Sequence, residues 1–153
     1  VFSIKQKISF LALMDSIALA MPIGLGLVRI GNFLNGELFG RPTNGEWGFI
    51  FPTDPLGIPR HPSQLYECFL EGIILFFVLN YVARQNVAKG VTASALLIFY
   101  GLFRFIVEFF RQPDIHIGLI AFDLSMGQIL SLPMMIIGLV LVVVFQRNNA
   151  TIS

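Results

Sequence analysis

The segment 124–146, LSMGQILSLPMMIIGLVLVVVFQ, contains no charged residue and decides the fold class. A helix needs about 20 mostly apolar residues to cross the hydrocarbon core of a bilayer. Three further segments meet this criterion, at 8–28, 65–82 and 91–110, each interrupted by only one or two charged side chains. The sequence therefore predicts an all-α, polytopic transmembrane helical bundle with about four spans, forming a single membrane domain over residues 1–153.

The composition supports this prediction and excludes several other classes. Of the 153 residues, 56% are hydrophobic and 12% are charged, whereas an ordinary soluble domain has about 25% charged residues. A disordered chain would need low hydrophobicity and high charge, and a net charge of +1 gives no footprint for nucleic acid. The single cysteine and the two distant histidines make no disulfide framework or metal signature. We therefore expect no nucleic-acid partner, no metal and no cofactor.

The connection at 29–64 is much longer than the other two. Its many Gly, Pro and Asn residues, together with its aromatic residues, predict a folded, turn-rich outer loop at the membrane surface, with Trp47 at the interface. One side of the predicted bundle has basic residues without acidic ones, namely Lys5, Lys7, Arg84, Lys89 and Arg147. The positive-inside rule then places both chain ends in the cytoplasm and the long loop outside.

Charged residues inside the spans are costly in hydrocarbon and usually face the interior of the bundle. Arg104 and Glu108 are four residues apart and share one helix face. They form either an ion pair that lets the helix insert, or an anion site in which Glu108 holds the guanidinium group for a phosphate. Arg29 is either a snorkelling anchor at the end of its span, or the start of a binding loop. That loop would contain Gly31, Asn32, Asn35, Gly36, Glu37 and Gly40.

Other polar positions also allow two interpretations. Ser63 is a candidate N-cap for the second span, with Glu67 in its first turn and Glu71 one turn later. His61 is either a proton acceptor or a hydrogen-bonding bracket in the loop. Asp15 is expected to face a polar group on a helix absent from this chain. Small residues recur every four positions in the first span, which predicts a tight packing face at Ala12, Ser16, Ala20 and Gly24.

Four motifs, in this order along the chain, resemble the signature segments of the bacterial prolipoprotein diacylglyceryl transferases. They are RIGNFLNGELFGR at 29–41, RHPSQLYE at 60–67, FRFIVEFFRQPD at 103–114 and MGQILS at 126–131. The resemblance covers nearly the whole chain and corresponds to the C-terminal half of the family. It implies that the family's N-terminal spans are absent, including a tyrosine and a His-Gly-Gly loop of the active site. Val28 stands where the family usually has Gly.

The resemblance implies transfer of the diacylglyceryl group from phosphatidylglycerol to the lipobox cysteine thiol of a prolipoprotein. The reaction forms a thioether and releases glycerol 1-phosphate, at the outer, periplasmic face of the bacterial inner membrane. Arg29 and Arg104 match essential arginines that would hold the headgroup phosphate. The other matching positions support catalysis or substrate binding, and they are Asn32, Glu37, Gly40, His61, Glu67 and Glu108. Glu37 and Glu108 are the catalytic candidates among them.

The resemblance places the proton acceptor in the absent His-Gly-Gly loop, so the isolated chain is expected to be inactive. A non-catalytic scaffold that only binds phosphatidylglycerol is the main alternative. A transporter with an intramembrane Arg–Glu gate is less consistent with the sequence, because the polar groups gather at one membrane face and form no path across the bilayer.

Overall fold

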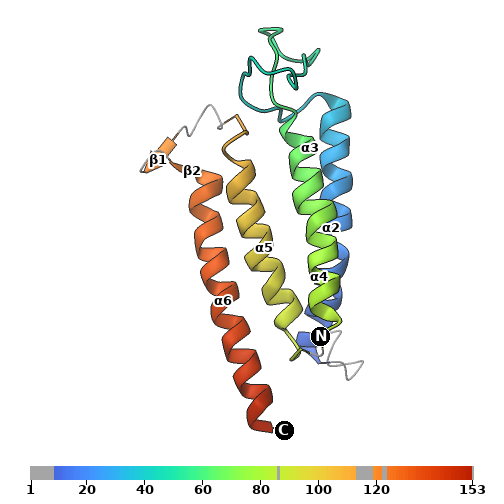
Figure 1. Ribbon diagram of the computed structural model, residues 1–153, viewed down its shortest axis with the longest axis vertical. Helices are drawn as coiled ribbons and strands as arrows, with labels where there is room; N and C mark the ends of the chain where they lie inside the picture. Colours follow the sequence, from blue (N-terminus) through green and yellow to red (C-terminus); the bar gives the residue numbers. More distant parts are fainter. Residues whose placement is uncertain (1–8, 86, 113–118, 122–123, 153) are drawn as a thin grey trace.

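The computed structural model describes residues 9–85, 87–112, 119–121 and 124–152, and most of them are helical (Figure 1). Helix α2 spans Phe10–Asn35. The next helical rod consists of α3 (Ser63–Glu67), the π-helix η1 (Cys68–Ile74) and α4 (Leu75–Ala83). Helices α5 (Val91–Val107) and α6 (Met126–Ile152) follow. A small antiparallel pair, β1 (Leu119–Ala121) and β2 (Leu124–Ser125), lies before α6.

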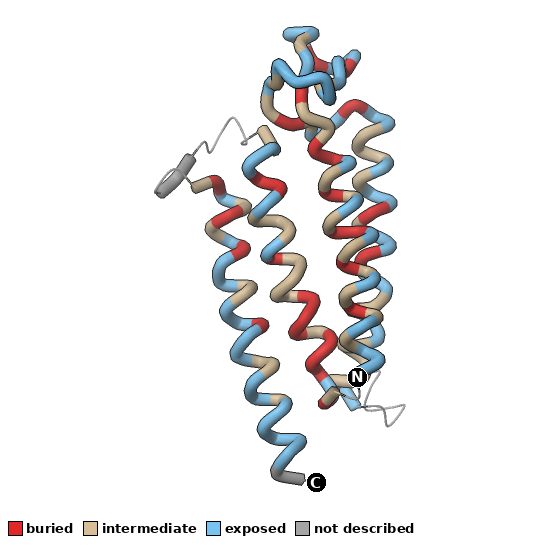
Figure 2. The backbone as a smooth tube through the Cα atoms, viewed as in Figure 1, coloured by how far each residue is buried: buried red, intermediate tan, exposed pale blue. Residues whose placement is uncertain are grey.

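The predicted class, an all-α membrane bundle, is confirmed. Among the described residues, three helices are long and apolar enough to cross a membrane, at Phe10–Asn35, Ser63–Ala83 and Met126–Ala150, and α5 is a shorter apolar helix. Apolar side chains such as Leu27, Phe77 and Ile136 are more than half exposed, and exposed residues dominate the outer faces of the helices (Figure 2). Such surfaces suit lipid tails, which are as apolar as the side chains themselves.

The first helix continues beyond the predicted end at residue 28. It ends at Asn35, where Gly36 adopts φ 68° and its N–H group donates to carbonyls of the last helical turn. A left-handed glycine is a common end for a helix because it has no Cβ to clash. Arg29 and Asn32 therefore lie on a helix and not in a loop. Lys5, Lys7, Ile8 and Asp114, which belong to segments named in the sequence predictions, lie outside the described residues.

The packing face of α2 differs from the predicted small-residue face. The helix buries Ala18, Pro22 and Gly26, whereas Gly24 is exposed and a Cβ atom there would meet nothing within 4 Å. A Cβ atom at Gly72 would lie only 2.9 Å from the Cα of Gly26. The backbones of α2 and η1 therefore meet at two glycines, one helical turn before Arg29.

Asp15 has a partner within this chain, contrary to the prediction. Its carboxylate accepts hydrogen bonds from the N–H groups of Gly90 (2.7 Å) and Ala93 (2.8 Å), at the start of α5. The first N–H groups of a helix lack partners inside the helix, and a carboxylate also suits the helix dipole there. Asp15 thus joins the lower part of α2 to the N-terminus of α5.

The segment 36–62 is folded and lies at one end of the bundle, opposite both ends of the described chain (Figure 1). The Phe51 ring lies 5.3 Å from Phe39 and 4.9 Å from Phe49, between ring centroids. The carboxylate of Asp54 pairs with Arg60 inside this segment. Trp47 remains 84% exposed, which leaves its ring available to a membrane interface.

Candidate functional site

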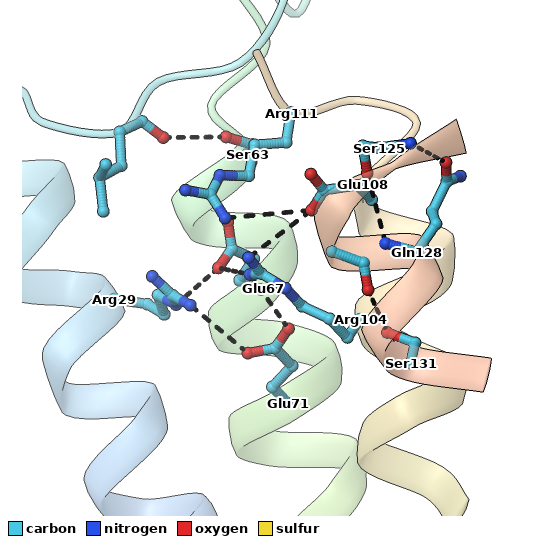
Figure 3. Close-up of polar contacts among 12 residues, drawn as sticks. Arg29, Ser63, Glu67, Glu71, Arg104, Glu108, Arg111, Ser125, Gln128 and Ser131 are labelled. Atoms are coloured by element: carbon cyan, nitrogen blue, oxygen red, sulfur yellow. Dashed lines mark hydrogen bonds and ion pairs between the residues drawn. The ribbon is translucent and has the colours of Figure 1, made fainter. Parts of the chain in front are cut away.

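Six charged side chains meet inside the bundle near the folded segment (Figure 3). We call them the Arg–Glu cluster: Arg29, Glu67, Glu71, Arg104, Glu108 and Arg111. They come from α2, from the α3–η1 rod, and from α5 with the turn that follows it. Charges are expensive away from water and persist there only when they are paired. The cluster satisfies this condition with three arginines and three glutamates, whose formal charges balance.

Glu67 is the centre of the cluster. Its Oε2 atom lies 2.6 Å from Nε of Arg29 and 3.2 Å from Nη1 of Arg104, so one oxygen joins α2 to α5. The Glu67 side chain is fully buried, whereas those of Arg29 and Arg104 are 14% and 17% exposed. Both arginine side chains are therefore slightly exposed, whereas the carboxylate that joins them is not.

The other two carboxylates flank this centre. Glu71 lies 3.8 Å from Nη2 of Arg29 and 4.0 Å from Nη1 of Arg104. Glu108 lies 3.6 Å from Nη2 of Arg104 and 3.9 Å from Nη1 of Arg111. These distances exceed those of a hydrogen bond, so the contacts are mainly electrostatic. The start of α6 contacts this group, because a Cβ atom at Gly127 would lie 2.7 Å from Oε2 of Glu108.

Local structure explains how the chain assembles this cluster. The close contact of Gly26 with Gly72 brings α2 against η1 and places Arg29 beside Glu67 and Glu71. The π-helix begins directly after Glu67, and π-helical turns occur frequently at functional sites. The planar fork of an arginine binds two phosphate oxygens at once. Two arginines from different helices, converging on one carboxylate, can therefore hold a phosphate group.

Four of the predicted site residues come together in the cluster: Arg29, Glu67, Arg104 and Glu108. Arg104 contacts Glu108 on its own helix as predicted, and it also contacts Glu67 on another rod. Arg29 is more than a snorkelling anchor, since it pairs with a fully buried carboxylate. The proposed cap at Ser63 is wrong, because Ser63 is the first helical residue and its hydroxyl donates to the carbonyl of Leu38 (3.2 Å).

The remaining predicted residues lie in or beside the folded segment, outside the cluster. The Glu37 side chain is exposed, while its backbone carbonyl accepts a hydrogen bond from Nε2 of Gln64 (2.6 Å). The carbonyl of Asn32 accepts the N–H of Glu37 (2.8 Å). The ring of His61 lies with Nδ1 3.3 Å from the Tyr66 hydroxyl, which is the bracket contact that the sequence allowed.

Gly40 has a specific structural role in this segment. Its N–H donates to the carbonyl of His61 (2.8 Å), and a Cβ atom there would clash with that carbonyl and with the carbonyl of Phe110. The next N–H, of Arg41, donates to the Phe110 carbonyl (2.9 Å). The absence of a side chain at Gly40 thus allows the folded segment to lie directly on the end of α5.

Sequence reasoning did not include Glu71 and Arg111 among the site residues. The spacing contained a signal for both, because Glu71 follows Glu67 by four residues and Arg111 follows Glu108 by three, and side chains at these spacings are neighbours on a helix. Within the described ranges, no group of three or more His, Cys, Asp or Glu side chains is arranged to hold a metal ion.

The sequence matches known proteins over most of its length. The family model described as prolipoprotein diacylglyceryl transferase matches residues 1–144. A phosphatidylglycerol–prolipoprotein diacylglyceryl transferase of Geobacter sulfurreducens is 54% identical over 145 residues, covering 95% of this chain and 55% of that protein.

Proteins of the same name from other bacteria match similarly. The one from Rickettsia akari is 54% identical over 140 residues, covering 90% of this chain and 54% of its own length. The one from Mannheimia succiniciproducens is 49% identical over 149 residues, covering 97% and 55%. The chain spans about half the length of the curated relatives it matches. With a family model that covers nearly all of its residues, the chain belongs to the prolipoprotein diacylglyceryl transferase family.

Proposed function

We propose that the protein transfers the diacylglyceryl group of phosphatidylglycerol to the lipobox cysteine of a bacterial prolipoprotein. The observation that carries the proposal is the convergence of Arg29 and Arg104 on Glu67, in a membrane bundle of this family. In the reaction, the cysteine sulfur attacks the carbon of the diacylglyceryl group that is bonded to the phosphate oxygen. A C–S bond forms, the C–O bond breaks, and glycerol 1-phosphate leaves with the electron pair. A base takes the thiol proton.

The Arg–Glu cluster suits the part of this reaction that involves the phosphate. Negative charge grows on the phosphate oxygens as the C–O bond breaks, and fixed cations in a water-poor site stabilise such charge strongly. Arg29 and Arg104 would supply these cations. Glu67 and Glu108 would keep the two guanidinium groups in place before the lipid arrives, so that little reorganisation is needed during the reaction.

The surroundings of the cluster suit a lipid. An apolar groove of about 310 Å³ runs along α2, η1 and the start of α4, and its lining includes Ile30, which follows Arg29 in the sequence, together with Leu27, Gly72 and Phe77. It offers space to an acyl chain while the headgroup phosphate reaches the arginine. Glu37, Asn32, Gly40 and His61 would shape the folded segment above the headgroup, which fits their contacts with one another and with the helix ends.

The proposal includes a membrane and an orientation. We place the protein in the bacterial inner membrane, with the folded segment and the cluster towards the periplasm. Arg84, Lys89 and Arg147 lie on the predicted cytoplasmic side, which agrees with the positive-inside rule. A prolipoprotein signal peptide would then present its lipobox cysteine from the same outer side as the cluster.

The function can be tested by transfer in a defined membrane. The protein expressed from its complete gene would be reconstituted into phosphatidylglycerol vesicles with a lipobox peptide, and thioether formation would be followed by mass spectrometry. We expect transfer by the wild type, and a decrease of about a hundredfold or more for Arg29→Ala and for Arg104→Ala, since removal of one charge-stabilising group typically costs this much.

Arg84→Ala is the matched control, because Arg84 is an exposed arginine outside the cluster and its loss should leave transfer unchanged. Absence of transfer by the wild type, with phosphatidylglycerol still bound, would favour the scaffold alternative. Full transfer by both cluster variants would contradict the roles assigned to the arginines.

A further inference from the structure

Glu71 differs from every other carboxylate of the Arg–Glu cluster. Its side chain is fully buried, and neither of its oxygens has a hydrogen-bond partner among the residues that the structure describes. Its two arginine contacts, at 3.8 and 4.0 Å, are too long for hydrogen bonds. Glu67, by contrast, has a 2.6 Å contact with Arg29. Glu71 is thus the one carboxylate of the cluster whose two oxygens are both buried without a hydrogen-bond partner among the described residues.

Charged and titratable groups face Glu71 from each element packed around it. Helix α2 contributes Arg29, the preceding turn contributes Glu67, and α5 contributes Tyr100 and Arg104. Arg111 acts from the turn after α5. With all three glutamates and all three arginines ionised, the cluster is neutral before any ligand binds.

A phosphodiester headgroup changes this balance. It brings one negative charge, and its oxygens compete with the carboxylates for the same guanidinium groups. Excess charge in a water-poor site is costly unless a group takes up or releases a proton. Protonation of Glu67 would weaken its 2.6 Å contact with Arg29, whereas Glu71 has no contact of hydrogen-bond length to lose and both of its oxygens lack a partner among the described residues. A proton from solution is therefore accommodated at Glu71 with the least loss of existing contacts.

We infer that binding of the phosphodiester headgroup at Arg29 and Arg104 is coupled to uptake of one proton by Glu71. This inference rests on the proposed function, because it concerns the same phosphate site. In this mechanism the proton passes from solution to a carboxylate oxygen of Glu71, and the cluster remains neutral in the bound state. Glu71 acts as a positioning residue, since it reaches the phosphate through the arginines. Its ionised form holds the empty site together, and its neutral form allows the arginines to turn towards the ligand.

Calorimetry can count this proton directly. Dihexanoyl phosphatidylglycerol would be titrated into the protein in maltoside micelles at pH 8, in phosphate-free buffers of different ionisation enthalpy. The dependence of the observed heat on buffer enthalpy gives the number of protons taken up. We expect about one proton for the wild type and about zero for Glu71→Gln, which mimics the protonated carboxylate and should still bind the lipid. Glu46→Gln, at an exposed carboxylate of the folded segment, should behave like the wild type.

Two results would overturn the inference: binding by the wild type without proton uptake, or uptake of about one proton by Glu71→Gln. Should that variant fail to fold, the pH dependence of binding by the wild type still tests the coupling. The affinity of the wild type for the lipid should fall by up to about tenfold for each unit that the pH rises, over the range in which Glu71 of the unbound protein is ionised. A constant affinity would contradict the coupling.

The transfer assay separates this inference from the proposed function. Proton-coupled binding without transfer refutes only the function, and transfer with pH-independent binding refutes only the role of Glu71.

Discussion

Glu67 has a single carboxylate oxygen that contacts arginines from two helices, 2.6 Å from Arg29 and 3.2 Å from Arg104. We predict that Glu67→Gln lowers transfer about a hundredfold or more, because both guanidinium groups lose the charge that orients them. The same change removes the negative charge that compensates the largely buried guanidinium groups of Arg29 and Arg104. Loss of one partner of a buried ion pair typically costs about 3–5 kcal/mol of folding free energy. The measurements are the transfer rate in vesicles and thermal unfolding in detergent.

Glu46→Gln provides the comparison for this prediction, since it removes an equal charge from an exposed position in the folded segment. It should change neither the rate nor the unfolding temperature measurably. An intact transfer rate in Glu67→Gln would show that the arginines keep their orientation without this carboxylate, and would remove Glu67 from the site.

The contact between α2 and η1 depends on two glycines, and it determines where Arg29 lies. A Cβ atom at Gly72 would be 2.9 Å from the Cα of Gly26, and that contact is with backbone, which cannot rotate away. Gly72→Ala should therefore force the two helices apart and weaken the pairing of Arg29 with Glu67. We predict a loss of about 1–3 kcal/mol of stability, as for other overpacked sites, together with a lower transfer rate.

Gly24→Ala is the matched control on the same helix, because a Cβ atom at Gly24 would meet nothing within 4 Å. Alanine is a better helix former than glycine by up to about 1 kcal/mol, so this variant should be equally or more stable. Both variants would be compared by thermal unfolding and by transfer. Equal behaviour of the two would mean that the close approach at Gly72 does not position the cluster.

The spans were predictable from the sequence, and so were the contacts between site residues that are close neighbours on one helix. Apolar length alone determines a membrane helix, and a spacing of four residues alone places Arg104 beside Glu108. The contacts of Arg29 with Glu67 and of Asp15 with Gly90 join different helices. They depend on which face of α2 packs inward, and the regular small residues indicated the wrong face. A glycine facing lipid and a glycine facing a helix look the same in a single sequence.

The folded segment was predictable as a structure but not in its connections. Its aromatic and turn-forming residues indicated order, whereas the continuation of α2 to Asn35 was hidden by polar residues that are typical of loops. The segment is held to the end of α5 by backbone contacts such as the N–H of Arg41 to the carbonyl of Phe110, and by the hydrogen bond from Arg60 to Gln112. Backbone pairing of this kind has no side-chain pattern, so only the three-dimensional structure identifies it.

Arg60, which pairs with Asp54, connects the folded segment to Gln112 beyond α5. The pair makes the stability of the folded segment depend on pH. Arg60 contacts both oxygens of Asp54, at 2.6 and 3.1 Å, and its Nη1 donates to Oε1 of Gln112 beyond α5 (3.2 Å). The hydrogen bond from Arg60 lowers the pKa of Asp54 below its ordinary value of 3.8. A carboxyl group with a lowered pKa stabilises the folded state above its unfolded pKa, and this stabilisation disappears as the pH falls through the folded pKa.

We therefore predict that the segment 36–62 loses protection before the helices do as the pH falls below about 4, because the helices do not depend on the carboxylate of Asp54. Hydrogen exchange followed by mass spectrometry would measure the protection of the amides of Phe49 and Arg60, which pair with each other's carbonyls, relative to those of α5. In Asp54→Asn the protection at pH 7 should be lower and should no longer change as the pH falls, whereas Glu46→Gln should follow the wild type. Unchanged protection of the segment in the wild type down to pH 2, or simultaneous opening of the segment and α5, would show that the pair does not control this part of the molecule.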